Sequence, residues 1–303
     1  MRKITYFVFN LFLISLFCQP AQSRQQSEGQ LLFSFGVIAD VQYADAEQAG
    51  KRNYRGTIKT LERTVPRLNE HELSFVASLG DLIDRDYESF AKPIALMDQS
   101  KSKVHYVLGN HEFSVEDRLK KTVPQLLNNP KRYYSFIVDN FRMLILNGME
   151  ESMDAYPERS RKYKTGEERY QQLKSSGANN ARTYNGGLGK KQRNWLAREL
   201  RKAERKDQNV ILFCHFPLLP ENGLQLWDNR EVLRRIEDSD AVVAYFSGHH
   251  HAGNYVLEDG VHHLTFKGMV ESEAEVSGGI VEVYEDKLII HGLGEQEDQI
   301  LKF

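Results

Sequence analysis

Five short apolar runs, each ending in a side chain that can bind a metal, constrain this chain more than any other feature. The clearest run is Phe75–Leu79, which stops at Gly80-Asp81. An apolar run of this length with an abrupt polar end predicts a buried strand that carries a carboxylate to the edge of a sheet. In open α/β sheets, ligands gather at that edge. The other four runs end at Asp40-Val41-Gln42, at Asn110-His111, at His215 and at His249-His250-His251.

The side chains at these five ends form one set of carboxylate, amide and imidazole donors. The candidate metal ligands are Asp40, Gln42, Asp81, Asn110, His215, His249 and His251. Such a mixture suits Mn²⁺, Fe²⁺, Zn²⁺ or Co²⁺. It is too rich in nitrogen for Ca²⁺ or Mg²⁺ alone, and it lacks the thiolates that mark structural zinc. The sequence therefore predicts two divalent ions bridged by Asp81, a pair that at about 3.5–4 Å can clamp a phosphoryl group during in-line displacement.

Each motif also has an ordinary structural explanation when it is taken alone. A Gly-Asp pair is commonly a turn, Asn110-His111 can cap a helix, His215 can be a core histidine, and the histidine triplet can bind metal adventitiously. Their joint occurrence, each after a predicted strand, favours the metal site. His250 is left out of the site, because in a strand-end pattern it should point away from its two neighbours.

Together the motifs resemble those of the calcineurin-like metallophosphoesterases: Asp-x-Gln, Gly-Asp-x-x-Asp, Gly-Asn-His-Glu, a later His after a strand, and Gly-His-x-His. The resemblance covers nearly the whole chain after its N-terminal segment. It implies a four-layer α/β/β/α sandwich of two mixed sheets. It implies one metal held by Asp40, Gln42, Asp81 and His251, and a second held by Asp81, Asn110, His215 and His249. His111 would be the histidine that contacts phosphate, either as a transition-state stabiliser or as a proton donor to the leaving group.

Gln42 departs from most of that superfamily, which has His at this position. A neutral amide oxygen donates less charge, so the ion there is expected to be harder and more loosely held, which favours Mn²⁺. The same Gln is similar to a subgroup, the manganese-dependent ADP-ribose/CDP-alcohol diphosphatases, which hydrolyse the pyrophosphate bond of nucleoside diphosphate-linked compounds. Further stretches resemble that subgroup: Ile38–Asp45, Tyr54-Arg55, Tyr184–Leu188, Leu224–Trp227 and, more weakly, Gly292–Gly294.

The activity expected from this resemblance is cleavage of a small-molecule phosphoanhydride such as ADP-ribose or a CDP-alcohol. Two alternatives stay open: a phosphodiesterase or phosphomonoesterase of unknown substrate, and a non-catalytic scaffold with the same fold. Arg55 is a candidate contact for the distal phosphate, since a guanidinium fork suits phosphate oxygens. An ordinary surface arginine explains Arg55 equally well.

Net charge limits the expected partners, and the N-terminal segment predicts where the protein is located. A formal net charge of -2 on 303 residues gives no reason to expect a nucleic acid or an anionic membrane as partner. Residues 1–23 carry a short basic start, an apolar run too short to span a bilayer and small residues before Ser23, which predicts a signal peptide followed by one domain over 24–303. Secreted or periplasmic localisation follows, with an uncleaved anchor or lipidation at Cys18 as alternatives. Cleavage would leave Cys214 without a disulfide partner, as a buried core residue.

Apolar spacing predicts helices over 54–68, 86–99, 115–128, 192–207 and 229–238, the last with Asn229 as its N-cap. Period-two patterns predict hairpins over 134–146, 255–266 and 280–290, with the C-terminal hairpins forming a second sheet packed on the first. Residues 148–183 read as a polar insertion. Their basic run 159–164 is either a phosphate-facing patch or a solvated surface.

Overall fold

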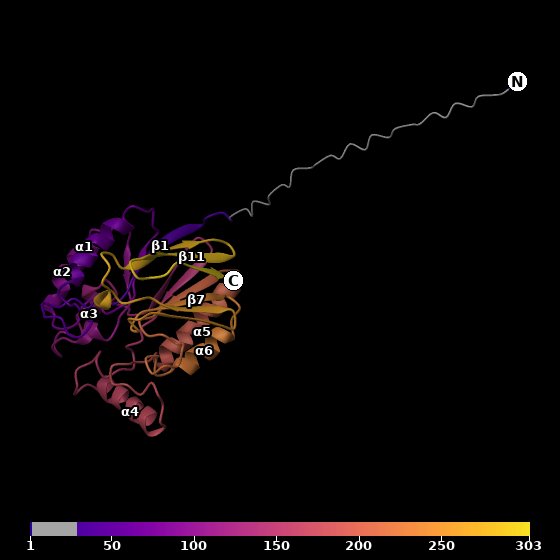
Figure 1. Ribbon diagram of the computed structural model, residues 1–303. Helices are drawn as coiled ribbons and strands as arrows, with labels where there is room; N and C mark the ends of the chain where they lie inside the picture. Colours follow the sequence, from indigo (N-terminus) through magenta and orange to yellow (C-terminus); the bar gives the residue numbers. More distant parts are fainter. Residues whose placement is uncertain (2–28) are drawn as a thin grey trace.

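The computed structural model describes Met1 and residues 29–303, so residues 2–23 of the predicted signal peptide, Cys18 among them, lie outside the described residues. Two six-stranded mixed sheets pack face to face, with helices on their outer sides (Figure 1). This architecture confirms the predicted α/β/β/α sandwich. Among the described residues, no helix combines the length and the apolar character that crossing a bilayer requires.

The first sheet has the order β12-β11-β10-β1-β2-β3, and its three N-terminal strands run parallel. Its strands are β1 (Phe33–Ile38), β2 (Val76–Ser78), β3 (Val104–Tyr106), β10 (Gly278–Val283), β11 (Lys287–Leu293) and β12 (Gln299–Lys302). The second sheet has the order β4-β5-β6-β7-β9-β8, with β5, β6, β7 and β9 parallel. Its strands are β4 (Tyr134–Val138), β5 (Phe141–Ile145), β6 (Asn209–Phe213), β7 (Val242–Ser247), β8 (Asn254–Glu258) and β9 (Val261–Thr265).

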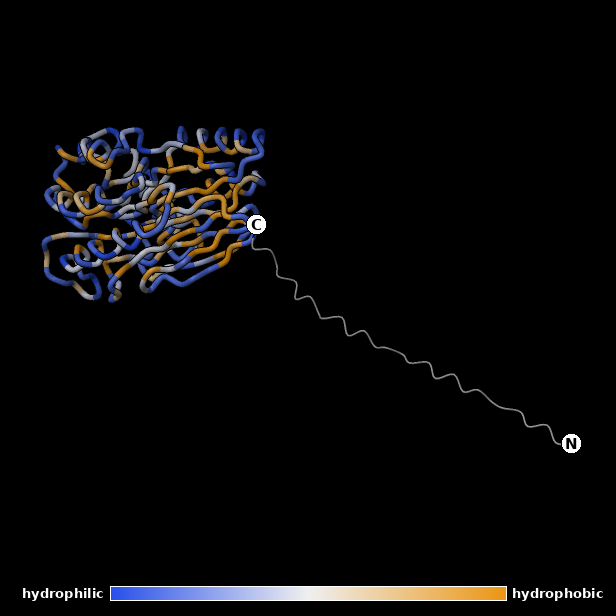
Figure 2. Tube along the Cα trace, turned by 90° about the horizontal axis from the view of Figure 1, so that it is seen from above, coloured by the Kyte–Doolittle hydropathy of each residue, from blue (hydrophilic) through white to orange (hydrophobic). Residues whose placement is uncertain are grey.

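The core between the sheets is built from alternate residues of the strands. In β1, Phe35 and Val37 face this core, while Ile38 belongs to the layer under the helices. Phe35 stacks on Phe75 with ring centroids 4.7 Å apart, and Phe213 of the second sheet meets Phe35 edge-on at 5.8 Å. Figure 2 shows the hydrophobic segments running through the interior and the hydrophilic ones outside. This packing holds the two sheets in a fixed relation, which the site at their edge needs.

The division of hairpins between the sheets differs from the prediction. The hairpin of β10 and β11 does not join a separate C-terminal sheet, because β10 pairs antiparallel with β1, with Val281 opposite Phe35. Nearly every residue of β10 is buried. A strand buried on both faces suits the middle of a sheet, so it takes its place beside β1. The other two hairpins, β4–β5 and β8–β9, lie at the two ends of the second sheet.

The helices are α1 (Thr57–Leu68), α2 (Ala91–Met97), α3 (Val123–Leu126), α4 (Arg161–Ser175), α5 (Lys190–Glu204) and α6 (Asn229–Glu237). The prediction of a long helix over 115–128 is wrong, since only α3 forms there. Pro124 lacks an N–H group and disfavours helical backbone before it, which opposes extension of the helix back toward residue 120. The predicted N-cap of α6 is also wrong. Asp228 holds that position, and its carboxylate accepts from the backbone N–H of Leu188 instead.

The polar insertion contains a helix that the sequence pattern did not indicate. In α4, which the structure describes in full, Gly166 alone is buried, so no apolar stripe announces the helix. Ser160 caps it by accepting a hydrogen bond of 3.1 Å from the Tyr163 N–H. The helix lies apart from the two sheets at the edge of the molecule (Figure 1). Its basic run does not line the cavity described below.

Candidate metal centre

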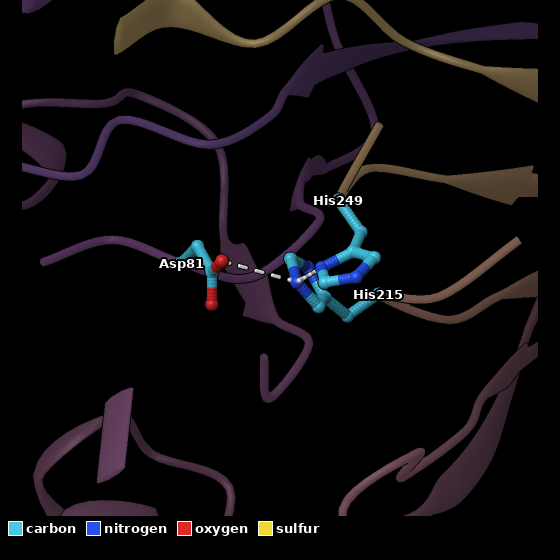
Figure 3. A group of neighbouring side chains, drawn as sticks. All are labelled: Asp81, His215 and His249. Carbon is cyan, nitrogen blue, oxygen red and sulfur yellow. Dashed lines mark hydrogen bonds and ion pairs between the residues drawn. The ribbon is translucent and has the colours of Figure 1, made fainter. Parts of the chain in front are cut away.

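The carboxyl ends of five strands, β1, β2 and β3 in one sheet and β6 and β7 in the other, meet at one edge of the sandwich. There, Nε2 of His215 lies 3.1 Å from Oδ2 of Asp81, 3.1 Å from Nδ1 of His249 and 3.2 Å from Oδ1 of Asn110. Figure 3 shows the three side chains Asp81, His215 and His249 pointing toward one another. A carboxylate, an amide and two imidazoles from four separate loops therefore present one ligand atom each to a common point.

A second group of side chains adjoins the first through Asp81. Nε2 of Gln42 lies 3.2 Å from Oδ2 of Asp81 and 3.1 Å from Nε2 of His251, and that His251 nitrogen is 3.6 Å from Oδ1 of Asp40. Asp81 is thus the residue that both groups share. The structure brings together all seven candidate ligands that the sequence indicated.

Gln42 provides the test of whether these residues fit a metal. Its Oε1 is buried and has no hydrogen-bond partner among the described residues, which is costly for a polar atom. If Oε1 and Nε2 of the Gln42 amide exchanged places, Oε1 would face Oδ2 of Asp81 and Nε2 of His251. All three of these atoms would then be hydrogen-bond acceptors. A cation between these atoms satisfies all of them, so the donor set fits a metal site.

Backbone strain concentrates at the same place. Asp40, Gln42, Asp81 and His249 all have φ between 43° and 66°, in the left-handed region that non-glycine residues rarely adopt. Such strain persists only where the surrounding structure imposes it, and it is common at functional sites. Gly80 also has a positive φ of 94°, and a Cβ there would lie 2.7 Å from Nδ1 of His215. The loops are therefore shaped to turn these side chains inward.

Each candidate histidine ligand is oriented by a hydrogen bond on its other ring nitrogen. Nδ1 of His215 lies 2.9 Å from the Leu79 carbonyl, and Nδ1 of His251 lies 2.9 Å from Oε1 of Glu271. Because both partners only accept, each Nδ1 carries the proton and each Nε2 is left for the metal side. Contacts of this kind fix the tautomer and the ring angle of metal-binding histidines.

Glu112 ties the Asp81 loop to the Asn110 loop. Its buried carboxylate accepts three backbone N–H bonds, from Gly109 at 2.7 Å, from Asp81 at 2.9 Å and from Leu82 at 2.6 Å. In the other direction, Oδ1 of Asp81 accepts from the His111 N–H at 2.8 Å. The two strand-end loops are therefore joined to each other through hydrogen bonds to the buried carboxyl groups of Glu112 and Asp81.

His111 stands beside the ligand cluster on the cavity side. Its Nδ1 lies 2.9 Å from the Asp84 carbonyl, so Nδ1–H donates and Nε2 is the free ring atom. Burial alone would lower the pKa of His111, but the neighbouring Asp81 carboxylate and the contact with Asp84 raise it above its usual value. A raised pKa favours the protonated imidazole, which can donate to an anionic group.

Charge in the cluster is unevenly balanced. Burial raises the pKa of Asp40, and the imidazoles of His251 and His215 offset this only in part. Burial would also raise the pKa of Asp81, yet His215 and His111 hold it below its usual range. Burial lowers the pKa of His215, but contact with Asp81 raises it to about 9. Among these groups, a proton on the His215 imidazole thus provides positive charge next to the Asp81 carboxylate.

A cavity of about 640 Å³ opens over the cluster, a size typical of small-molecule sites. Beyond the candidate ligands, its wall contains Arg52, His111, Asp154, Tyr184, Leu224, His250 and Glu271. As expected, His250 is not part of the ligand cluster. It does line the cavity wall, and its Nδ1 lies 3.4 Å from Nδ2 of Asn222.

The structure does not bring Arg55 into this cavity. Its guanidinium donates to Asp45 at 2.7 Å and to Glu47 at 2.8 Å, both on the exposed loop before α1. The cavity wall instead holds Arg52, whose Nε is 3.6 Å from Oε1 of Glu271. Sequence reasoning also missed Glu112, Glu271 and Asn185 as partners of the ligands. Only Glu112 and Asn185 had a local signal, since each lies inside a stretch that resembles the family.

Comparison with known proteins identifies the class. The family model of calcineurin-like phosphoesterases matches residues 33–253. The chain therefore belongs to this family of metallophosphoesterases and is a hydrolase, which confirms the resemblance found in the sequence.

Among curated relatives, the manganese-dependent ADP-ribose/CDP-alcohol diphosphatase of Arabidopsis thaliana is 31% identical, over 87% of this chain and 94% of the relative. The Homo sapiens protein of the same name is 29% identical, over 94% of this chain and 97% of the relative. In three dimensions the chain is similar to a dimetal phosphatase from Danio rerio, with a TM-score of 0.81 and 26% identity, over 90% of this chain and 100% of that one.

Proposed function

We propose that this chain hydrolyses the pyrophosphate bond of nucleoside diphosphate-linked compounds such as ADP-ribose or CDP-alcohols, with two divalent ions at the centre. The observation that carries the proposal is Gln42, an amide among the candidate ligands, with an Oε1 that is buried and unpartnered. The relatives that are similar along most of the chain are named for this activity and for manganese. A neutral oxygen ligand favours a hard ion, so Mn²⁺ is the proposed metal, with Fe²⁺, Zn²⁺ and Co²⁺ as alternatives.

One ion would be held by Asp40, Gln42, Asp81 and His251, and the other by Asp81, Asn110, His215 and His249. When bound, the pair supplies Lewis-acid polarisation of phosphoryl oxygens and an activated water. The protein's own part is to hold the ligand atoms in place before substrate arrives. The contacts of Glu112, Leu79 and Glu271 described above do this.

His111 is proposed as the residue that touches the reacting phosphoryl group. Its Nδ1–H donates a hydrogen bond to the Asp84 carbonyl, so its Nε2 is the atom that can face substrate in the cavity. In the protonated form favoured by Asp81, this atom can donate a hydrogen bond to a phosphoryl oxygen or a proton to the leaving group.

Arg52 is proposed as the contact for the second phosphate. It lines the cavity, and its salt bridge with Glu271 keeps it near the candidate ligand His251, to which Glu271 is hydrogen-bonded. A guanidinium in this position suits the oxygens of a phosphate next to the reacting one. Tyr184, whose ring centroid is 5.8 Å from that of His249, and Leu224 give the wall an aromatic and apolar part that suits a nucleoside.

A substrate panel tests the proposal. Purified protein with Mn²⁺ is assayed on ADP-ribose, CDP-alcohols, bis-p-nitrophenyl phosphate and p-nitrophenyl phosphate, with products identified by chromatography. Preferred cleavage of ADP-ribose or a CDP-alcohol to two phosphomonoesters is expected. Preference for a nitrophenyl ester would instead indicate a phosphodiesterase or phosphomonoesterase. Failure to hydrolyse any of them with metals bound would indicate a scaffold.

We also propose that the N-terminal segment directs export and is cleaved near Ser23, which places the enzyme outside the cytoplasm. N-terminal sequencing of protein purified from its native host tests this. A sequence that begins at Met1 would contradict it.

A further inference from the structure

Asn185 is a buried residue that joins the polar insertion to the metal centre. It belongs to Tyr184–Leu188, far along the chain from the strand-end motifs, and its side chain is fully buried. Its Oδ1 lies 3.1 Å from Nε2 of His249. His249 is the one candidate histidine ligand whose metal-facing atom is Nδ1, since that nitrogen lies 3.1 Å from Nε2 of His215.

The orientation of the Asn185 amide is fixed by its other contacts. Nδ2, with its two N–H groups, lies within hydrogen-bond distance of three backbone carbonyl oxygens, those of Asn180 at 3.1 Å, Gly223 at 2.9 Å and Gln225 at 3.1 Å. A flipped amide would point Oδ1 at three carbonyl oxygens, which no hydrogen could bridge. Oδ1 must therefore face His249 as an acceptor, and Nε2 of His249 must carry the proton.

We propose that Asn185 is a positioning residue that selects the Nε2–H tautomer of His249 and so leaves Nδ1 unprotonated toward the metal. The inference rests on the metal centre proposed above and deepens it. It also joins two loops to that centre, because the three carbonyls belong to residues 180, 223 and 225. The cavity-lining residues Tyr184 and Leu224 are direct neighbours of these anchor points.

The residues after Asn185 are suited to this placement. Gly186 packs so closely on the Gly148 carbonyl that a Cβ would collide with it, and a Cβ on Gly187 would lie 2.9 Å from Oδ1 of Asp228. Gly187 also exchanges two backbone hydrogen bonds with Glu151, at 2.8 and 2.9 Å. Two glycines let the backbone descend between these groups, which brings Asn185 within reach of His249.

The test compares Asn185→Ala with the matched control Asn180→Ala. Asn180 is buried in the same loop and donates from Nδ2 to the Leu226 carbonyl at 2.6 Å, but it does not touch a candidate ligand. Mn²⁺ binding to metal-free protein is measured from the free-ion signal in electron paramagnetic resonance. The tautomer of His249 is read from two-bond ¹H–¹⁵N correlations of the metal-free protein.

We expect Asn185→Ala to weaken one of two Mn²⁺ sites by about 10- to 100-fold, as loss of such a partner does elsewhere. We also expect the variant to lose the Nε2–H tautomer, whereas Asn180→Ala keeps both the tautomer and the affinity. Equal Mn²⁺ affinity in wild type and Asn185→Ala, or equal losses in both variants, would overturn the inference. If the wild type itself fails to bind two ions, the proposed metal centre fails instead, so the two failures are distinguishable.

Discussion

The backbone N–H of Asp81 donates a 2.9 Å hydrogen bond to Oε2 of Glu112, and the same oxygen accepts from Gly109 at 2.7 Å. One carboxylate oxygen thus joins the loop that carries the shared ligand Asp81 to the loop that carries Asn110 and His111. Removal of this oxygen would let the two loops separate, although Glu112 is not itself a candidate ligand.

Glu112→Gln is expected to weaken both the fold and the centre. Glutamine keeps the size of the side chain, but its NH₂ group would oppose at least one backbone N–H. The loss is expected to be about 1–3 kcal/mol in the free energy of unfolding, since a buried N–H left without an acceptor costs about that much. Urea unfolding of the metal-free protein measures this. A change under about 0.5 kcal/mol would show that the three contacts are not important.

Asp81→Asn is expected to remove metal binding while the fold is kept. Asn, like Asp, tolerates the left-handed backbone at this position, so the variant removes charge with little new strain. Hydrolysis should fall by more than about 100-fold, because even partners outside the ligand set cost 10- to 100-fold. Asp259→Asn, at another left-handed position in the turn after β8, is the matched control. Metal content and turnover near wild type in the Asp81 variant would refute its bridging role.

Removal of the metals is expected to abolish hydrolysis and lower the melting temperature. Ions that bind only the folded chain stabilise it by about 2.7 kcal/mol at a free concentration 100 times the dissociation constant. Calorimetry of chelator-treated protein, before and after Mn²⁺ is restored, measures both effects. A melting temperature independent of Mn²⁺ would argue against an ion at this centre.

The two neighbouring arginines provide a matched pair. Arg52→Ala should lower kcat/KM for ADP-ribose by about 10- to 100-fold, given about 1.5–3 kcal/mol for a charged hydrogen bond. The same variant should change hydrolysis of bis-p-nitrophenyl phosphate little, because that substrate has one phosphorus. Arg55→Ala, which loses only exposed contacts to Asp45 and Glu47, should leave both rates unchanged. The reverse pattern would restore Arg55 as the phosphate contact.

Acid should destabilise the fold through a histidine away from the centre. Burial lowers the pKa of His105 to about 4, and its ring stacks on Phe136 and contacts the Tyr134 hydroxyl at 2.7 Å. The unfolded chain binds this proton near pH 6.5, so between pH 6.5 and 4 the unfolded state holds more protons and stability falls as pH falls. The slope contributed is at most about 1.4 kcal/mol per pH unit. Unfolding of metal-free His105→Phe across this range should show a shallower decline, and an unchanged decline would contradict the assignment.

The candidate metal ligands could be predicted from the sequence because they occupy a repeated position, the end of a strand. Asp40, Asp81 and His215 each follow a buried apolar run, and the ends of parallel strands necessarily meet at one edge. The contacts that orient the ligands could not be found in this way. Glu271 reaches His251 from a short helical turn, and Asn185 reaches His249 from the loop that follows the polar insertion. Their roles depend on how loops fold over the site, and the spacing of apolar residues in the sequence does not predict loop conformation.

Arg52 and Arg55 illustrate the same limit for the substrate side. Both arginines lie just before α1 in the chain, so residue type and sequence position do not show which of them faces the cavity. Only the backbone course of the loop sends one guanidinium toward Glu271 and the other toward Asp45. Helix α4 was missed for a different reason, since a helix with one buried residue leaves no trace in apolar spacing.

The proposed ligands come from both halves of the sandwich. Asp40, Gln42, Asp81 and Asn110 follow strands of the first sheet, whereas His215, His249 and His251 follow strands of the second. Each ion would therefore cross-link two layers that otherwise meet mainly through apolar side chains, with a few polar contacts such as that of His105 with the Tyr134 hydroxyl. Slippage of one layer against the other would break coordination at both ions at once, so thermal inactivation and metal release should be a single cooperative event in this enzyme.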